Sequence, residues 1–132
     1  MLFKDVIGNF KAKNSLLKAI DQKRISHSML FFGAIGSGTL ALAIAFARLV
    51  LCQDKPETSS CHIKASKFQH PDLHFVYPVA QTQNVKGKVI SESFISEWRA
   101  FLSEKPYGNL LEWYEKIGIE NKQGKIGKDE AN

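Results

Sequence analysis

The chain has 132 residues, of which 44% are hydrophobic and 23% charged, a composition that supports one modest core and excludes a disordered chain. Its longest apolar stretch, residues 40–52, is interrupted by Arg48 and is shorter than the ~20 residues that a membrane-spanning helix needs. The first residues lack the layout of a secretory signal, so we expect a cytoplasmic protein with no membrane partner. The formal net charge of +5 favours contact with polyanions without specifying one.

The first half of the chain predicts a helix, a strand and a second helix. Residues 3–8 are expected to be extended, and the turn after them to lead into an amphipathic helix that ends at Gln22. The apolar run of residues 28–32 predicts a buried strand. Residues 39–51 are apolar on every side and contain four alanines, which predicts an interior helix packed on a sheet.

The second half begins with a polar stretch, residues 53–60, that predicts an exposed loop. The aromatic and β-branched residues 72–79 predict a second strand. Residues 91–104 have helical spacing, with Ser91 or Ser93 as the expected N-cap. After a turn, residues 110–117 predict one more short helix, and the remaining residues are polar.

Between the first strand and the apolar helix lies the glycine framework of a phosphate-binding P-loop. A working loop has the form G-x-x-x-x-G-K-[ST], in which the lysine reaches the β/γ-phosphates and the hydroxyl holds Mg²⁺. Here Thr39 stands at the lysine position and Leu40 at the hydroxyl position. We therefore expect no catalytic residue and no ATPase activity. The residues expected to form this degenerate nucleotide-binding loop are Gly33, Gly36, Ser37, Gly38 and Thr39.

Two interpretations of this loop remain open. Backbone N–H groups and the N-terminus of the following helix still attract anions, which allows weak binding of ATP or ADP. Alternatively, the glycines only let a strand turn tightly into a helix, because glycine tolerates positive φ. The predicted fold is α/β, the N-terminal portion of a P-loop (AAA+ or RecA-like) domain with a parallel sheet flanked by helices. Two strands are too few for such a sheet, so we expect a truncated domain.

The sequence resembles a known family. Residues 3–9, residues 24–33 and the P-loop, in that order, resemble the start of bacterial clamp-loader AAA+ subunits. Residues 70–79 and 120–124 are similar to the delta prime subunits of DNA polymerase III in Bacteroidetes-type bacteria. The lost lysine separates this chain from the gamma/tau subunits, whose P-loop is intact.

The resemblance implies a noncatalytic subunit of the DNA polymerase III holoenzyme that helps load the sliding clamp onto primed DNA. Its implied partners are the gamma/tau and delta subunits, and the clamp and primed DNA through the assembly. Residues 1–132 would then be a partial AAA+ domain, with residues 53–70 as an inserted loop at the family's zinc-module position and residues 120–132 as a polar tail. The family's trans-acting arginine lies in a Ser-Arg-Cys motif, which this sequence lacks.

The two cysteines resemble what is left of that zinc module, whose ligand spacing is C-x8-C-x2-C-x2-C. Cys52 and Cys61 reproduce the first spacing, but Lys64 and Lys67 occupy the third and fourth positions. A structural zinc site needs four ligands, for which His62 and His70 are candidates. We nevertheless expect no zinc and two reduced thiols, since disulfides are rare in the cytoplasm.

Two other function classes compete with the scaffold subunit. One is an independent ATPase with an atypical P-loop. The other is a small DNA-binding module, to which a mild cluster of lysines near the C-terminus would contribute. Trp98, Trp113 and Tyr114 are spaced as helix faces and are expected to pack in a core rather than stack on bases. The clustered lysines are Lys116, Lys122, Lys125 and Lys128.

Overall fold

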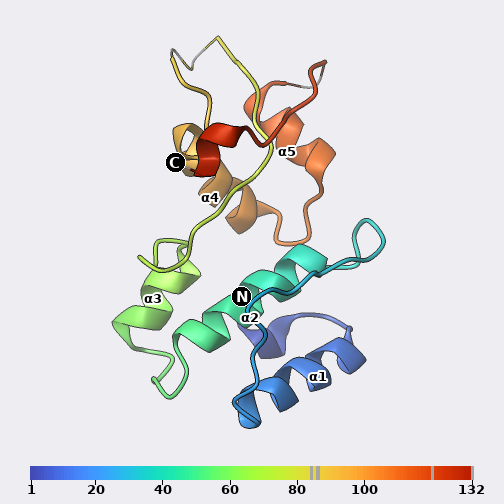
Figure 1. Ribbon diagram of the computed structural model, residues 1–132, viewed down its shortest axis with the longest axis vertical. Coiled ribbons are helices and arrows are strands. Elements are labelled where there is room, and N and C mark those ends of the chain that lie inside the picture. The colour runs from blue at the N-terminus through green and yellow to red at the C-terminus, as the bar shows by residue number, and fades with distance from the viewer. Residues whose placement is uncertain (84, 86, 120, 132) are drawn as a thin grey trace. The chain divides into compact units, whose positions relative to one another are not determined.

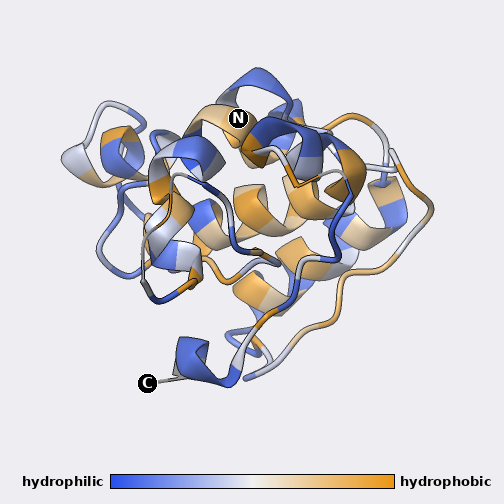
Figure 2. Ribbon diagram, turned by 90° about the horizontal axis from the view of Figure 1, so that it is seen from above, coloured by the Kyte–Doolittle hydropathy of each residue, from blue (hydrophilic) through white to orange (hydrophobic). Residues whose placement is uncertain are grey.

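The computed structural model describes residues 1–83, 85, 87–119 and 121–131 (Figure 1). Of residue 131 it describes only the backbone. The chain forms two compact units, an N-terminal unit, Met1–Asp72, and a C-terminal unit, Leu73–Asn132. Hydrophobic residues are concentrated along the inner helices, and the short turn beside the C-terminus is hydrophilic (Figure 2).

The N-terminal unit contains a 3₁₀ turn and three helices, coloured blue to green in Figure 1. Its core joins Phe3 and Val6 near the N-terminus to Ile20 and to one side of the second long helix. That helix packs on the 3₁₀ turn and on the third helix rather than on a sheet. The elements are η1 (Phe3–Asp5), α1 (Phe10–Asp21), α2 (Thr39–Leu51) and α3 (Ser60–Ser66).

The C-terminal unit is built around aromatic rings. The Tyr77 ring stacks on Trp98 with 4.2 Å between centroids, and Trp113 meets both rings edge-on at 5.2 and 5.0 Å. Trp113 also donates a hydrogen bond from its indole to the Pro78 carbonyl. Core packing of both tryptophans is therefore confirmed. The elements are η2 (Ser91–Phe94), α4 (Ile95–Glu104), α5 (Leu110–Ile117) and η3 (Lys128–Ala131).

The predicted parallel sheet is wrong, because no named strand occurs in the described part of the chain. Residues 28–32 are not a buried strand either, since Leu30 and Phe32 are each 85% exposed. In residues 72–79 only Val79 pairs, in one antiparallel bridge to Lys125 with hydrogen bonds of 3.0 and 3.1 Å. A strand requires a neighbour to accept and donate its backbone hydrogen bonds, and these segments lack one over most of their length.

The helix predictions fare better. Helices α2 and α5 match the predicted residues at both ends, and α1 ends one residue before Gln22. The prediction of a loop was wrong for α3. Ser59 caps this helix by accepting a hydrogen bond from the His62 N–H. Residues 3–8 begin with η1 rather than an extended segment.

The predicted cap of the helix over residues 91–104 is also wrong. Its first turn is the 3₁₀ helix η2, and α4 begins after Phe94. The Ser91 hydroxyl instead bonds to the Tyr77 carbonyl and to Glu130.

Among the described residues, we find no helix with the length and hydropathy needed to span a bilayer.

Candidate functional site

Of the five residues predicted to form a degenerate P-loop, Gly33, Gly36, Ser37 and Gly38 lie in the turn before α2, and Thr39 is the first residue of that helix. Gly36 and Gly38 both have φ of +81°, which other residues rarely adopt. The Ser37 N–H donates to the Ala34 carbonyl at 3.0 Å, and the Gly38 carbonyl accepts the first hydrogen bond of α2 from Leu42. The loop therefore has the turn-then-helix part of the predicted arrangement, without a preceding strand.

Protein side chains occupy the inside of this turn. A Cβ atom on Gly33 would lie 2.7 Å from the Ser37 hydroxyl oxygen and 2.9 Å from the Thr39 methyl group. A side chain at this position would therefore crowd Ser37 and Thr39 unless these two side chains shifted. The Asn9 side-chain amide donates to the Ser37 carbonyl at 2.9 Å, which ties the loop to the start of α1.

The loop lacks the charges of a triphosphate site, since residues 33–40 contain no lysine or arginine. Thr39 is the first residue of α2, so the position of the missing lysine is filled by a short, uncharged side chain. The backbone N–H groups at the start of this 13-residue helix remain as anion donors. An open, largely apolar cavity of about 490 Å³ adjoins the loop between α1, α2 and residues 29–32.

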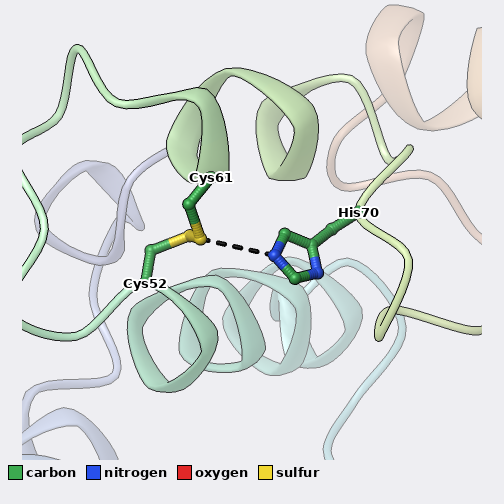
Figure 3. Close-up of side chains that lie close together, drawn as sticks. All are labelled: Cys52, Cys61 and His70. Carbon is green, nitrogen blue, oxygen red and sulfur yellow. Dashed lines mark hydrogen bonds between the residues drawn. A yellow bond between two sulfur atoms is a disulfide. The ribbon is translucent and has the colours of Figure 1, made fainter.

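The second candidate site, formed by Cys52, Cys61 and His70, lies where the end of α2 meets α3 (Figure 3). Cys52 is the C-cap of α2 and Cys61 lies in the first turn of α3, and their sulfurs form a disulfide with 5.8 Å between the Cα atoms. The expectation of two reduced thiols is therefore wrong in this structure. The unpredicted helix α3 turns the chain back so that Cys61 faces the end of α2.

The two neighbouring histidines have different roles. His62 is buried and accepts a hydrogen bond at Nδ1 from Arg48 Nε at 3.2 Å. His70 instead faces the disulfide, with Nε2 3.4 Å from Cys61 Sγ. Sequence reasoning treated the two histidines alike, and only the folded chain distinguishes them.

The donor set does not fit a closed zinc site in this state. Cys52, Cys61 and His70 place one ligand atom each within 4.8 Å of one another. However, the two sulfurs are bonded to each other, whereas zinc binds cysteine as the thiolate. A structural zinc site also needs four ligands, and this cluster offers three. Lys64 and Lys67, at the third and fourth positions of the family's pattern, are exposed.

The charge excess lies outside the predicted lysine cluster. The N-terminal unit has ten lysines and arginines against five acidic residues, whereas the C-terminal unit has eight of each. Lys116 forms an ion pair with Glu104 at 2.7 Å, and the Lys122 ammonium donates to the Gln81 carbonyl. The net charge of +5 therefore belongs to the N-terminal unit. The charges can be counted from the sequence, but the division between the two units comes from the structure.

In the C-terminal unit, Tyr77 forms a buried polar contact that stabilises structure. Burial, together with the nearby carboxylates of Glu97 and Glu130, raises the pKa of Tyr77 well above its usual value. The hydroxyl therefore stays protonated and donates to the Ser91 carbonyl at 2.6 Å. This contact holds the start of η2 against the aromatic core.

Comparison with known proteins identifies the family to which the chain belongs. Residues 8–123, which include the loop and the cysteine–histidine cluster, match the family described as "DNA polymerase III, delta subunit". The chain is also similar to DNA polymerase III subunit tau of Bacillus subtilis (strain 168), with 37% identity over 60 residues. That similarity covers 46% of this chain and 11% of the tau subunit. No solved structure matches the chain. Because the family match extends over most of its length, the chain belongs to the DNA polymerase III delta-subunit family.

Proposed function

We propose that the chain is a noncatalytic clamp-loader subunit of the delta prime type, in its Bacteroidetes-type form. In this role it helps to load the sliding clamp onto primed DNA during replication. Its partners are the gamma/tau and delta subunits, and it reaches the clamp and the DNA through the assembly in the cytoplasm. The family match and the similarity to a tau subunit support a role in replication.

One observation carries the noncatalytic part of the proposal. The loop before α2 keeps its glycine turn, but Thr39 and Leu40 stand where a working loop has its lysine and its Mg²⁺-binding hydroxyl. Phosphoryl transfer depends almost entirely on positioning and on stabilising charge, so a loop without these groups loses most of its catalytic power. A subunit of this kind contributes as a fixed part of the assembly. Binding of ATP or ADP to its backbone N–H groups would be weak.

Reconstitution tests the subunit role. The chain is mixed with the tau and delta subunits of the same organism, and the mixture is separated by size-exclusion chromatography. We expect the chain to elute with them, and clamp loading onto primed DNA to depend on its presence. The Thr39→Ala variant should load clamps at the wild-type rate, because Thr39 has no catalytic task. Failure to co-elute, or a large loss of loading in Thr39→Ala, would contradict the proposal.

The partition of charge favours a second candidate function, direct DNA binding by the N-terminal unit. Neutralisation of phosphates by its lysines would make the affinity fall steeply with salt. Affinity for a primed duplex is therefore measured over a range of salt concentrations. The exposed pair Lys11→Glu and Lys18→Glu should weaken binding and lower the salt dependence, while Lys122→Glu serves as a control in the neutral unit. An affinity independent of salt excludes this function.

A further inference from the structure

We propose that the Cys52–Cys61 disulfide is a reversible redox lock between α2 and α3, and that His70 stabilises its reduced state. Small thiols of the glutathione class reduce the bond. In the reduced state the Nε2–H group of His70 donates a hydrogen bond to the Cys61 thiolate. Nothing in the proposed replication role requires this chemistry, so the inference stands apart from it.

The hydrogen bonds of His70 determine which of its nitrogens carries the proton. Its Nδ1 accepts a hydrogen bond from the Asp72 N–H at 3.2 Å, so the neutral ring carries its proton on Nε2. Nε2 is the nitrogen that faces Cys61 Sγ at 3.4 Å. A thiolate accepts such a hydrogen bond more strongly than a disulfide sulfur does, because it is charged. His70 therefore stabilises the reduced state more than the oxidised one.

This arrangement also distinguishes the two sulfurs in thiol–disulfide exchange. A small thiolate attacks Cys52 Sγ, forms a mixed disulfide with it, and breaks the bond to Cys61, which leaves as a thiolate. A second small thiolate attacks the outer sulfur of the mixed disulfide and releases Cys52, which takes a proton from solvent. The net reaction consumes two small thiols and yields the Cys52 thiol, the Cys61 thiolate, one proton released to solvent and one small-molecule disulfide. The sulfur with the stabilised thiolate is the better leaving group, so exchange starts at Cys52.

Both sulfurs are buried, and the size of α3 explains how a thiol reaches them. Cys52 and Cys61 are 2% and 6% exposed. Helix α3 has only seven residues, too few to be stable on its own, and it follows an exposed stretch of residues 53–58. Local opening of such an element is far easier than unfolding of a core. Disulfides of cytoplasmic proteins are usually transient or redox-sensing, and the proposed location fits a reversible bond.

Equilibration with glutathione buffers tests the proposal on the whole chain. The reduced fraction is measured by acid quenching, alkylation and mass spectrometry. The His70→Ala variant should need more reduced glutathione, with its reduction equilibrium constant lowered about tenfold. The His70→Gln variant retains an N–H donor and should recover part of the loss. The exposed His74→Ala variant is the matched control and should behave like the wild type.

A second measurement does not depend on disulfide formation. In the Cys52→Ser variant the remaining Cys61 thiol should react with iodoacetamide about tenfold faster than Cys52 does in the Cys61→Ser variant. Circular dichroism of each variant verifies that its helix content is kept. Equal alkylation rates, or an unchanged equilibrium constant in His70→Ala, would overturn the role of His70. Stoichiometric zinc on the reduced pair, or no disulfide in oxidised glutathione, would overturn the lock itself.

Discussion

The two units of this chain differ in charge, in core and in the chemistry that they carry. The N-terminal unit is basic, contains the loop and the disulfide, and leaves Leu30, Phe32 and Ile35 each 85% exposed. The C-terminal unit is neutral and buries a cluster of aromatic rings. Residues suited to binding or redox chemistry thus lie in the basic unit. Its structure should depend on individual bonds, whereas that of the C-terminal unit depends on packing.

The largest expected effect is in the C-terminal unit. Trp113 is 1% exposed, contacts the rings of Tyr77, Trp98 and Phe101, and donates to the Pro78 carbonyl. The Trp113→Ala variant should lose about 3–5 kcal/mol of unfolding free energy for this unit. Urea denaturation followed by Trp98 fluorescence measures the loss.

Leu111 on the same helix is the control for this substitution, because it is 68% exposed. The Leu111→Ala variant should change the unfolding free energy by less than about 0.5 kcal/mol. Similar losses in the two variants would show that the aromatic cluster does not stabilise the unit.

The next effect concerns the N-terminal unit. The disulfide closes a loop between cysteines nine positions apart. Its removal in the Cys61→Ser variant should destabilise this unit by about 2.5 kcal/mol, chiefly through the entropy of the unfolded chain. Hydrogen exchange followed by mass spectrometry resolves the two units. Amides of α3 should exchange faster while those of α4 stay protected, and equal changes in α4 would contradict the separation of the units.

The helix caps allow a smaller comparison between the units. The Asn109 side chain accepts hydrogen bonds from the N–H groups of Leu111 and Glu112, so the Asn109→Ala variant should lose about 1 kcal/mol. Asn9 starts α1 with a left-handed backbone and makes no such cap. The Asn9→Gly variant keeps that backbone readily but loses the exposed hydrogen bond to the Ser37 carbonyl, so it should lose about 0.5 kcal/mol, less than Asn109→Ala. Thermal unfolding of both variants checks the difference.

The smallest expected effect is a pH dependence at the same cap. The hydrogen bond from Lys105 and then the Asn109 backbone N–H lower the pKa of the half-buried Glu112 carboxyl. Because the pKa of Glu112 is lower in the folded chain, its contribution is present above the unfolded pKa of about 4.3 and is lost as the pH falls through the folded value.

Melting temperatures at a series of acidic pH values measure this contribution. The Glu112→Gln variant should lose less stability than the wild type as the pH falls below about 4.3. Glu115→Gln, on the same helix, is the control. A parallel decline in wild type and Glu112→Gln would contradict the assignment.

The sequence predicted the elements whose signals are local. Helix α2 is set by its own run of apolar residues and α5 by the spacing of its apolar residues, so both were located correctly. Residues 28–32 have the composition of a strand, but strand formation depends on a partner elsewhere, and none pairs with them in the described chain. The composition of a short segment does not show whether another segment will pair with it.

The candidate sites follow the same rule. The loop residues are neighbours in sequence, and in the structure they form a turn followed by the start of α2, whereas the strand expected before them is absent. The disulfide and the choice of His70 over His62 depend on the path of the chain through α3, a helix that sequence reasoning took for loop. Its one local signal was Ser59, a good N-cap residue at the end of a polar stretch.

Hydrolysis of ATP in the presence of Mg²⁺ tests the central claim, that the glycine loop before α2 has lost its catalytic charges. The isolated chain should hydrolyse ATP no faster than a buffer blank. The Gly33→Val variant places a side chain against Ser37 and Thr39 and should give the same result. Turnover by the wild-type chain that Gly33→Val abolishes would show a working loop and contradict the account.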